Sequence, residues 1–267
     1  MPVDAVVLES ADAARLRGSR FAEVLQLART TSTNLVAAER ARAGSREGLV
    51  VVADHQNAGR GRLDRTWEAP PGSSLLLSVL FRPRPADLAP VQRHMAVWAV
   101  SLAAVEAARV VAGLELRLKW PNDVVAMDAG AVAKVAGVLA EAGTGWMVVG
   151  VGLNVSWSPP SLPATSLEAL AGRRVPRSQL LVELLLALDR LYGQWPEVSR
   201  LYRARCATLG RVVNVQRPGR ELLVGTAVDL GEHGELVVDP GQGGREEVVY
   251  GDVTHATLGP PGSLPTR

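Results

Sequence analysis

GLVVVADHQNAGRGRLDRTW, residues 48–67, is the segment around which the rest of the chain can be arranged. Residues 49–53 form an apolar run rich in valine, which is typical of a strand buried on both faces of a sheet. The segment then alternates glycines with Arg60 and Arg62, and Arg65 follows. Glycine lets a backbone lie close to a ligand, and arginine offers a fork of donors to carboxylate or phosphate. The pattern indicates an anion-binding loop, although a solvated, arginine-rich surface turn would have the same sequence.

The composition indicates a folded cytoplasmic protein. With 267 residues, of which 47% are hydrophobic, the chain can form one large domain or one large and one small domain. Its net charge of +2 gives no strong general attraction to nucleic acid. The single cysteine, Cys206, excludes an internal disulfide and a multi-cysteine zinc site, and fits a reducing compartment. The N-terminus lacks the order of a signal peptide, and the longest apolar run, residues 95–105, is too short to cross a membrane.

Lysine is rare in this chain. Of the 29 basic residues, 27 are arginine, and the exceptions are Lys119 and Lys134. An ammonium is a compact point charge and a guanidinium is wide and planar, so the exceptions indicate places where a guanidinium would not fit. Lys119 begins a KWPND segment, residues 119–123, after an alternating strand at 114–118. Lys134 lies in a hairpin predicted from strands at 124–127 and 131–142, where it is either a solvated lysine or part of a site.

Three further segments place polar groups beside predicted secondary structure. Residues 30–34, TTSTN, precede a helix at 35–43 and hold more hydroxyls than one N-cap requires. KWPND presents a lysine, an amide and a carboxylate at the end of a strand that the proline terminates. A buried strand at 146–155 contains Gly150 and Gly152, which permit close backbone approach, and Asn154 near its end. We expect these segments to line a pocket, although helix capping and an Asn-Asp turn are alternatives for the first two.

The rest of the chain supplies a core and a second, smaller unit. We predict a short helix at 11–20, an apolar strand at 74–81, and helices at 87–112, at 178–195 and from 196 to about 207. Beyond residue 209 the pattern changes to short alternating segments separated by Gly and Pro turns, which is typical of a small β-barrel. The sequence therefore predicts a main domain over 1–208, a barrel over 209–258 and a disordered tail over 259–267.

Five motifs, taken in order, resemble those of the biotin protein ligase family. They are Ser32-Thr33-Asn34; Gln56 with Gly59-Arg60-Gly61-Arg62, Arg65 and Trp67; Lys119-Trp120-Pro121-Asn122-Asp123; Lys134-Val135-Ala136-Gly137; and Gly150-Val151-Gly152-Leu153-Asn154. A lone GRGR is weak evidence, but five ordered motifs across about residues 25–156 are specific. The resemblance implies an α+β fold: a mixed sheet flanked by helices, the class II synthetase-like fold of biotin and lipoate ligases, followed by an SH3-like β-barrel.

The resemblance also implies a reaction. Biotin's carboxylate would attack the α-phosphate of ATP to give biotinyl-5′-AMP, which would then acylate a lysine of a biotin carboxyl carrier protein. The implied biotin-binding residues are Ser32, Thr33, Asn34, Gln56, Arg60, Gly61, Arg62, Trp67 and Lys134. The implied residues for ATP or the adenylate are Arg62, Arg65, Lys119, Asn122, Asp123, Lys134 and Asn154. Lys134 and Arg62 would be catalytic. Lys119, Asn122, Asp123 and Asn154 would serve the nucleotide and its Mg²⁺, and of these four the carboxylate of Asp123 is the candidate metal ligand.

The chain departs from the family pattern at both ends. About 20 residues precede the first strand that we predict, at 21–27. They are too few for the winged helix that some members carry, so we expect the enzyme-only type without specific DNA binding. Some relatives have an arginine near the chain end that approaches the adenylate. Residues 251–258 contain none, so we assign no barrel residue to the site. We expect no membrane partner, and a monomer or a weak homodimer.

Two other classes of protein fit parts of the sequence. Lipoate ligases and octanoyltransferases share the implied architecture, but a transferase of this kind needs a nucleophilic cysteine near its lysine. Cys206 lies in a late helix, beyond the pocket motifs. An arginine-rich RNA-binding protein with a barrel module is disfavoured by the low net charge and by motifs that follow buried strands.

Overall fold

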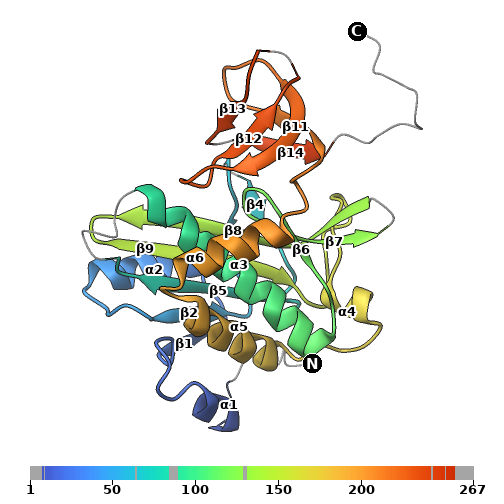
Figure 1. Ribbon diagram of the computed structural model, residues 1–267. Coiled ribbons are helices and arrows are strands. Elements are labelled where there is room, and N and C mark those ends of the chain that lie inside the picture. Colours follow the sequence, from blue (N-terminus) through green and yellow to red (C-terminus); the bar gives the residue numbers. More distant parts are fainter. Residues whose placement is uncertain are drawn as a thin grey trace.

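A seven-stranded mixed sheet forms the centre of the computed structural model (Figure 1). In spatial order its strands are β1 (Val24–Leu27), β2 (Val50–Ala53), β5 (Ser74–Phe81), β9 (Trp146–Asn154), β8 (Ala131–Gly143), β7 (Asp123–Asp128) and β6 (Arg117–Lys119). β1 and β2 are parallel, and the other neighbouring strands are antiparallel. The structure describes residue 8 and residues 10–63, 65–83, 90–128, 131–241, 243–249 and 251–255.

Helices cover both faces of this sheet, so its central strands are buried on both sides (Figure 1). α3 (Pro90–Ala112), α5 (Arg177–Leu191) and α6 (Trp195–Arg205) lie on one face, and α2 (Thr33–Arg42) lies on the other. Along β2 the side chains alternate: Val50 and Val52 join the larger apolar cluster, and Val51 joins the cluster under α2. This alternation explains the continuous apolar run that the sequence shows there.

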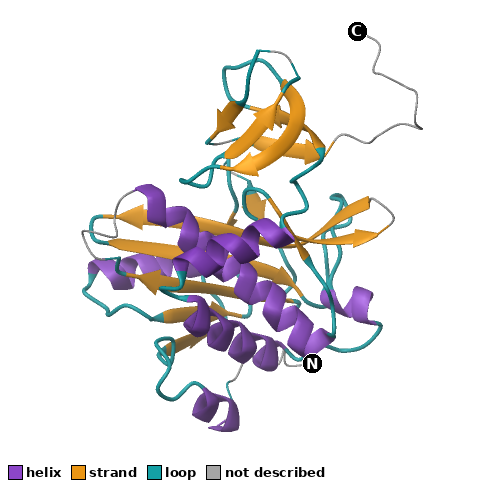
Figure 2. Cartoon of the chain, in the orientation of Figure 1, coloured by secondary structure: helices purple, strands orange, loops and turns teal. Residues whose placement is uncertain are grey.

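A smaller antiparallel sheet follows at the C-terminal end (Figure 2). Its order is β13 (Glu246–Val248), β12 (Leu236–Asp239), β11 (Leu223–Leu230), β10 (Val212–Gln216) and β14 (Asp252–His255). The remaining elements are α1 (Ser10–Arg15), α4 (Leu167–Ala171) and the short hairpin of β3 (Gly59–Arg60) and β4 (Thr66–Trp67). The mixed sheet with flanking helices and the C-terminal β unit confirm the predicted fold class.

Trp120 of the KWPND segment joins the two units. Its indole Nε1 donates a hydrogen bond of 2.8 Å to the carbonyl of Gly234 in a barrel turn. Its backbone N donates a bond of 3.0 Å to Oγ1 of Thr208, in the segment that leads into the barrel. His94 of α3 lies against the same turn, since a Cβ placed on Gly234 would come within 2.7 Å of the His94 ring. The barrel is therefore attached beside residues that the sequence assigns to the site.

Several predicted boundaries are wrong. The helix predicted at 178–195 ends at Leu191, because Tyr192 is extended and Gly193 has a φ of 85°, and Trp195 begins α6. The helix predicted at 11–20 is shorter, and α4 and β14 were not predicted. The predicted tail at 259–267 lies outside the described residues, and so do residues 129 and 130, which join the two strands of the predicted hairpin.

α3 extends well beyond the apolar run at 95–105. Among the described residues it is the one helix that is long and apolar enough to cross a membrane. Of that segment 67% is buried inside the protein, against the sheet and against α5 and α6, which is how the central helix of a folded core is packed.

Candidate active site

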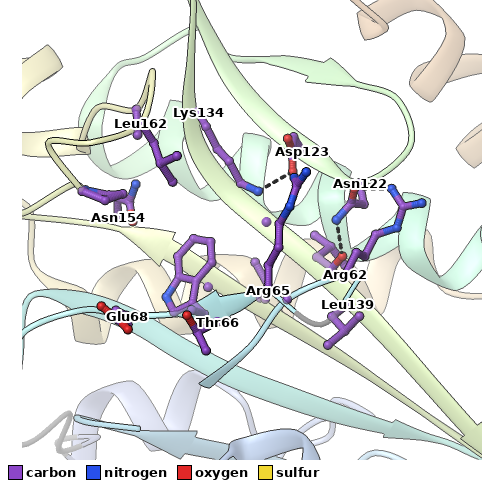
Figure 3. A pocket seen from close by; sticks show the side chains of 18 of the residues that line it. Arg62, Arg65, Thr66, Glu68, Asn122, Asp123, Lys134, Leu139, Asn154 and Leu162 are labelled. Atoms are coloured by element: carbon purple, nitrogen blue, oxygen red, sulfur yellow. Dashed lines mark hydrogen bonds and ion pairs between the residues drawn. The ribbon is translucent and has the colours of Figure 1, made fainter. Parts of the chain in front are cut away.

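A cavity of about 1150 Å³ opens on the α2 face of the main sheet (Figure 3). Its walls are the start of α2, the β3–β4 hairpin, strands β8 and β9, a Pro-rich loop at 157–163 and part of the barrel. Every residue that the sequence analysis assigned to the site lines this one cavity: Ser32, Thr33, Asn34, Gln56, Arg60, Gly61, Arg62, Arg65, Trp67, Lys119, Asn122, Asp123, Lys134 and Asn154. Segments far apart in the chain are thus brought together as expected.

Glycines on β9 create the floor of the cavity. On this face of β9, Trp146 and Val148 pack in the cluster under α2, and then Gly150 and Gly152 carry no side chain. A Cβ on Gly150 would lie 2.2 Å from Oδ1 of Asn34, and one on Gly152 would lie 2.5 Å from the Trp67 indole. Both distances are far below van der Waals contact, so these positions must be glycine for the neighbouring side chains to keep their places.

The start of α2 forms a polar, uncharged end of the cavity. Ser32 is the N-cap residue, with extended backbone, and its hydroxyl makes no capping hydrogen bond. Oε1 of Gln56 accepts bonds from the backbone N of Thr33 at 2.8 Å and from its Oγ1 at 3.0 Å. The polar cluster at 30–34 therefore does more than cap the helix, as its composition predicted.

Asn34 is held by residues that the sequence analysis missed. Oγ of Ser78 lies 2.6 Å from Oδ1 of Asn34 and 2.7 Å from Oγ1 of Thr33, and Ser78 is fully buried. Nδ2 of Asn34 donates a bond of 2.8 Å to Glu141, which also pairs with Arg60 at 2.7 Å. A serine in the middle of the apolar strand SLLLSVLF, residues 74–81, was the available signal for this role.

Trp67 forms an apolar wall between the two ends of the cavity. Its ring lies directly over Gly152 and beside Gly137, where an added Cβ would come within 3.1 Å of it. The Nζ atom of Lys134 lies 5.7 Å from the ring centroid. The indole Nε1 of Trp67 is buried and has no hydrogen-bond partner among the described residues. The wall therefore separates the uncharged polar groups at α2 from the charged groups around Lys134.

The other end of the cavity is cationic. Lys134 Nζ lies 2.6 Å from Oδ1 of Asp123 (Figure 3). Arg62 donates to Oδ1 of Asn122 at 3.1 Å and to a barrel carbonyl at 3.4 Å. Burial lowers the pKa of the Arg62 guanidinium, and the nearby carboxylate of Asp123 opposes this shift. Of the described residues that line the whole cavity, six are basic and three are acidic, so the cavity favours an anionic ligand.

The Pro-rich loop at 157–163 closes the side of the cavity next to Lys134. The backbone N of Lys134 donates to the carbonyl of Pro163 at 2.8 Å, and the N of Thr165 donates to the carbonyl of Lys134 at 2.9 Å. Nδ2 of Asn154 donates to the carbonyl of Thr165 at 3.1 Å. No local pattern in the sequence marks this segment as a wall of the site.

The barrel also contributes to the cavity, which corrects an expectation. We assigned no barrel residue to the site because residues 251–258 contain no arginine. The structure nevertheless places Arg211, Asp252, Val253 and Thr254 along the cavity. Asp252 pairs with Arg65 of the hairpin. The expectation failed because it looked only for an arginine near the chain end, whereas β10 and β14 pair side by side and other barrel residues reach the cavity.

Two kinds of chemistry find no support in the described residues. No group of three or more His, Cys, Asp or Glu side chains is placed to hold a metal ion by protein ligands alone. Cys206 is buried and does not line the cavity. Burial raises the pKa of its thiol, which keeps the thiolate scarce and makes it a poor nucleophile.

Comparison with known proteins gives consistent matches over most of the chain. The profile of the biotin/lipoate A/B protein ligase family matches residues 26–155, and that of the biotin protein ligase C-terminal domain matches residues 208–255. The biotin–[acetyl-CoA-carboxylase] ligase of Mycobacterium tuberculosis is 38% identical over 250 residues, which cover 89% of this chain and 91% of that protein.

Solved structures agree with the sequence matches. The biotin protein ligase from Aquifex aeolicus in complex with biotin and ATP matches with a TM-score of 0.74 and 25% identity, over 88% of this chain and 99% of that one. The biotin protein ligase from Leishmania major in complex with biotinyl-5-AMP matches with a TM-score of 0.58 and 25% identity, over 85% and 99% of the two chains.

Proposed function

The chain belongs to the biotin protein ligase family, and on that basis we propose how it works: it activates biotin with ATP as biotinyl-5′-AMP and transfers biotin to one lysine of a biotin carboxyl carrier protein. The observation that carries this proposal is the division of the cavity. An uncharged polar end and a cationic end are separated by the wall of Trp67. Biotin has the matching order of groups, since a neutral ureido ring and an apolar chain lead to a carboxylate.

The uncharged end suits the ureido ring. Ser32, Thr33, Asn34 and Gln56 line it, and amide and hydroxyl side chains can both donate to and accept from a urea group. Trp67 covers the glycine floor and would pack against the apolar rings and chain. The segment Arg60-Gly61-Arg62 would lie over bound biotin and exclude water from the reactive adenylate.

The cationic end suits the first chemical step. A carboxylate oxygen of biotin attacks the α-phosphorus of ATP, the bond from that phosphorus to the bridging oxygen breaks, and pyrophosphate leaves. Lys134 would bring the two anions together, because its ammonium has three donors and Asp123 occupies one of them. Arg62 and Arg65 would face the phosphates, and Lys119, Asn122, Asp123 and Asn154 would bind the nucleotide.

The cationic end offers Mg²⁺ one proposed protein ligand, the carboxylate of Asp123. Mg²⁺ at nucleotide sites is typically held by one or two carboxylates together with phosphates and water. Asp123 supplies one carboxylate at the cationic end, and one of its oxygens pairs with Lys134. When bound, the ion would neutralise charge on the polyphosphate, and Asp123 is the residue that we propose as its protein ligand.

The second step uses a partner protein. The ε-amine of the carrier lysine attacks the acyl carbon of the mixed anhydride, the bond from that carbon to the phosphate oxygen breaks, and AMP leaves. The amine loses a proton to solvent, because no described His side chain lines the cavity to accept it. We propose a cytoplasmic enzyme that acts as a monomer or weak homodimer, with a ligase domain over 1–208 and a barrel over 209–258.

Exchange of labelled pyrophosphate into ATP tests the proposal. The purified protein should catalyse this exchange only when biotin is present, because the reverse reaction needs the biotinyl adenylate. Lipoate or octanoate in place of biotin should give no more exchange than the reaction without acid. A second assay should detect transfer of biotin to an isolated carrier domain, and not to the same domain with its acceptor lysine changed to arginine. Exchange with lipoate alone would assign the chain a different acid substrate.

A further inference from the structure

Arg211 brings a positive charge from the barrel to the cavity. It lies immediately before β10, lines the cavity and is half-buried. Both backbone polar groups of Arg211 form hydrogen bonds. Its N donates to the carbonyl of Thr208 at 3.3 Å, and its carbonyl accepts from the N of Ala227 at 2.9 Å. A residue whose main chain is anchored in this way presents its side chain from a defined position.

The same anchoring places Arg211 next to the nucleotide end of the cavity. The segment before it follows β6, since the N of Ala207 donates to the carbonyl of Leu118 at 2.7 Å. The next residue, Thr208, accepts a hydrogen bond from Trp120, as described above. β6 ends at Lys119, which also lines the cavity. Lys119 and Arg211 therefore reach the cavity from adjacent segments.

The charges of the neighbouring residues leave Arg211 available for a ligand. Lys134, Arg65 and Arg60 each form an ion pair with a protein carboxylate. Within the described parts of the chain, no acidic side chain forms an ion pair with Arg211, although several cations share its cavity. A half-buried guanidinium among other cations is favourable only when an anion completes the site.

We propose that Arg211 binds the β- and γ-phosphates of ATP and retains them as pyrophosphate leaves. This inference rests on the proposed function. A polyphosphate is the most highly charged group that the reaction brings to the cavity, and a planar guanidinium binds phosphate oxygens in pairs. In the proposed function the biotin carboxylate is bound by Lys134, whose Nζ lies beside the Trp67 ring. The barrel thus supplies part of the nucleotide site.

The test compares Arg211→Gln with Arg220→Gln. Arg220 lies on an exposed barrel turn and does not line the cavity, so it is a matched control for loss of a barrel arginine. Loss of a charge-assisted hydrogen bond corresponds to about a ten-fold or larger change in affinity. In pyrophosphate exchange, Arg211→Gln should raise the KM values of ATP and of pyrophosphate by about that factor. The KM of biotin, and transfer from preformed biotinyl-AMP, should stay within about two-fold.

The other possible outcomes distinguish a failure of the Arg211 inference from a failure of the proposed function. If the wild-type protein shows no biotin-dependent exchange, the proposed function fails. If wild-type exchange is normal and Arg211→Gln leaves both KM values unchanged, the role of Arg211 is wrong. A raised KM for the carrier domain alone would place Arg211 at the partner interface and also overturn it. If Arg211→Gln does not melt like the wild type, Arg211→Met, which keeps the apolar stem, is measured in the same way.

Discussion

At the scale of the residue, Lys134 shows why the type of cation matters. Its ammonium reaches Asp123 at 2.6 Å and lies beside the Trp67 ring. In a chain that uses arginine 27 times, lysine at this position indicates a space that a guanidinium does not suit. In the proposed adenylation, two anions must approach bonding distance around this one charge. A compact ammonium permits that approach, and a wide guanidinium would hold the two anions apart.

Lys134→Arg should therefore nearly abolish biotin-dependent pyrophosphate exchange while the protein stays folded. The fold should survive because an arginine at 134 can still pair with Asp123. A misplacement of about 1 Å can reduce a rate on the order of 100-fold. Transfer from preformed biotinyl-AMP should suffer less, because the two anions are already joined. Retention of more than half of the wild-type exchange would mean that Lys134 is an ordinary hairpin lysine.

Ser78→Ala should destabilise the protein and weaken biotin binding. The hydroxyl lies between Asn34 and Thr33, so its loss leaves a buried acceptor without a donor, which costs about 1–3 kcal/mol. Ser101→Ala is the matched control: Ser101 is equally buried, but its hydroxyl only donates to the carbonyl of Val97, four residues earlier in α3. Thermal melts and biotin titrations of both variants provide the comparison. Equal biotin affinity in the two variants would contradict a role for Ser78 in the site.

At the scale of the element, the β3–β4 hairpin and its loop close the cavity. Arg62 links this loop to Asn122 and to the backbone of Gly251, so one side chain ties three segments together. Arg62→Gly would remove both links and all of the charge. Stopped-flow measurements should then show faster release of biotinyl-5′-AMP, with a smaller effect on biotin binding. An unchanged release rate would exclude the loop as the element that retains the adenylate.

The sequence predicted those elements whose pattern is local. β5 and β9 are continuous apolar runs, and KWPND marks the end of β6 through its proline, so each could be located directly. The break between α5 and α6 was predicted, but the end of α5 was placed at Trp195 instead of Leu191 because the apolar spacing continues through Tyr192 to Trp195. The contact of Arg65 with Asp252 joins residues 187 positions apart, and no local pattern contains that information. The residues of the main domain that line the cavity could therefore be predicted from local motifs. The barrel residues that line it could not be predicted in this way.

At the scale of the whole molecule, the barrel is connected to the site by two routes. One is the contact of Gly251 and Asp252, at the start of β14, with the arginines of the hairpin loop. The other is the contact of the barrel turn at Gly234 with Trp120 and His94. Trp120 lies two residues before Asn122, which Arg62 contacts. A change in how the barrel packs should therefore reach the cavity through both the loop and the KWPND segment.

His94 makes this junction sensitive to acid. Burial lowers the pKa of His94 from 6.5 to about 4, and nearby Glu235 opposes this shift only in part. Between these pH values the unfolded chain binds a proton that the folded protein excludes. The contribution of His94 to stability is therefore complete above about pH 6.5 and is lost as the pH falls toward 4. The melting temperature should fall across that range.

His94→Leu should reduce this fall in melting temperature between pH 6.5 and 4. Both ring nitrogens are buried without a hydrogen-bond partner among the described residues, so an apolar side chain is tolerated there at neutral pH. Melts of the wild type and the variant across the pH series give the difference, and other titrating groups contribute equally to both. Parallel curves for the two proteins would show that the junction does not respond to His94.

The placement of both lysines in the cavity has a consequence for the chemical selectivity of the protein's surface. Lys119 and Lys134 are the only two lysines of the chain, and both line the cavity. Apart from the terminal amine, the exterior carries its positive charge on guanidinium groups, which stay protonated and do not attack acyl groups. In the proposed reaction, an acyl adenylate that leaves the cavity would meet almost no nucleophilic amine on the surface of the protein that made it. The protein should label itself poorly, and a soluble amine-reactive reagent should report whether the cavity is occupied.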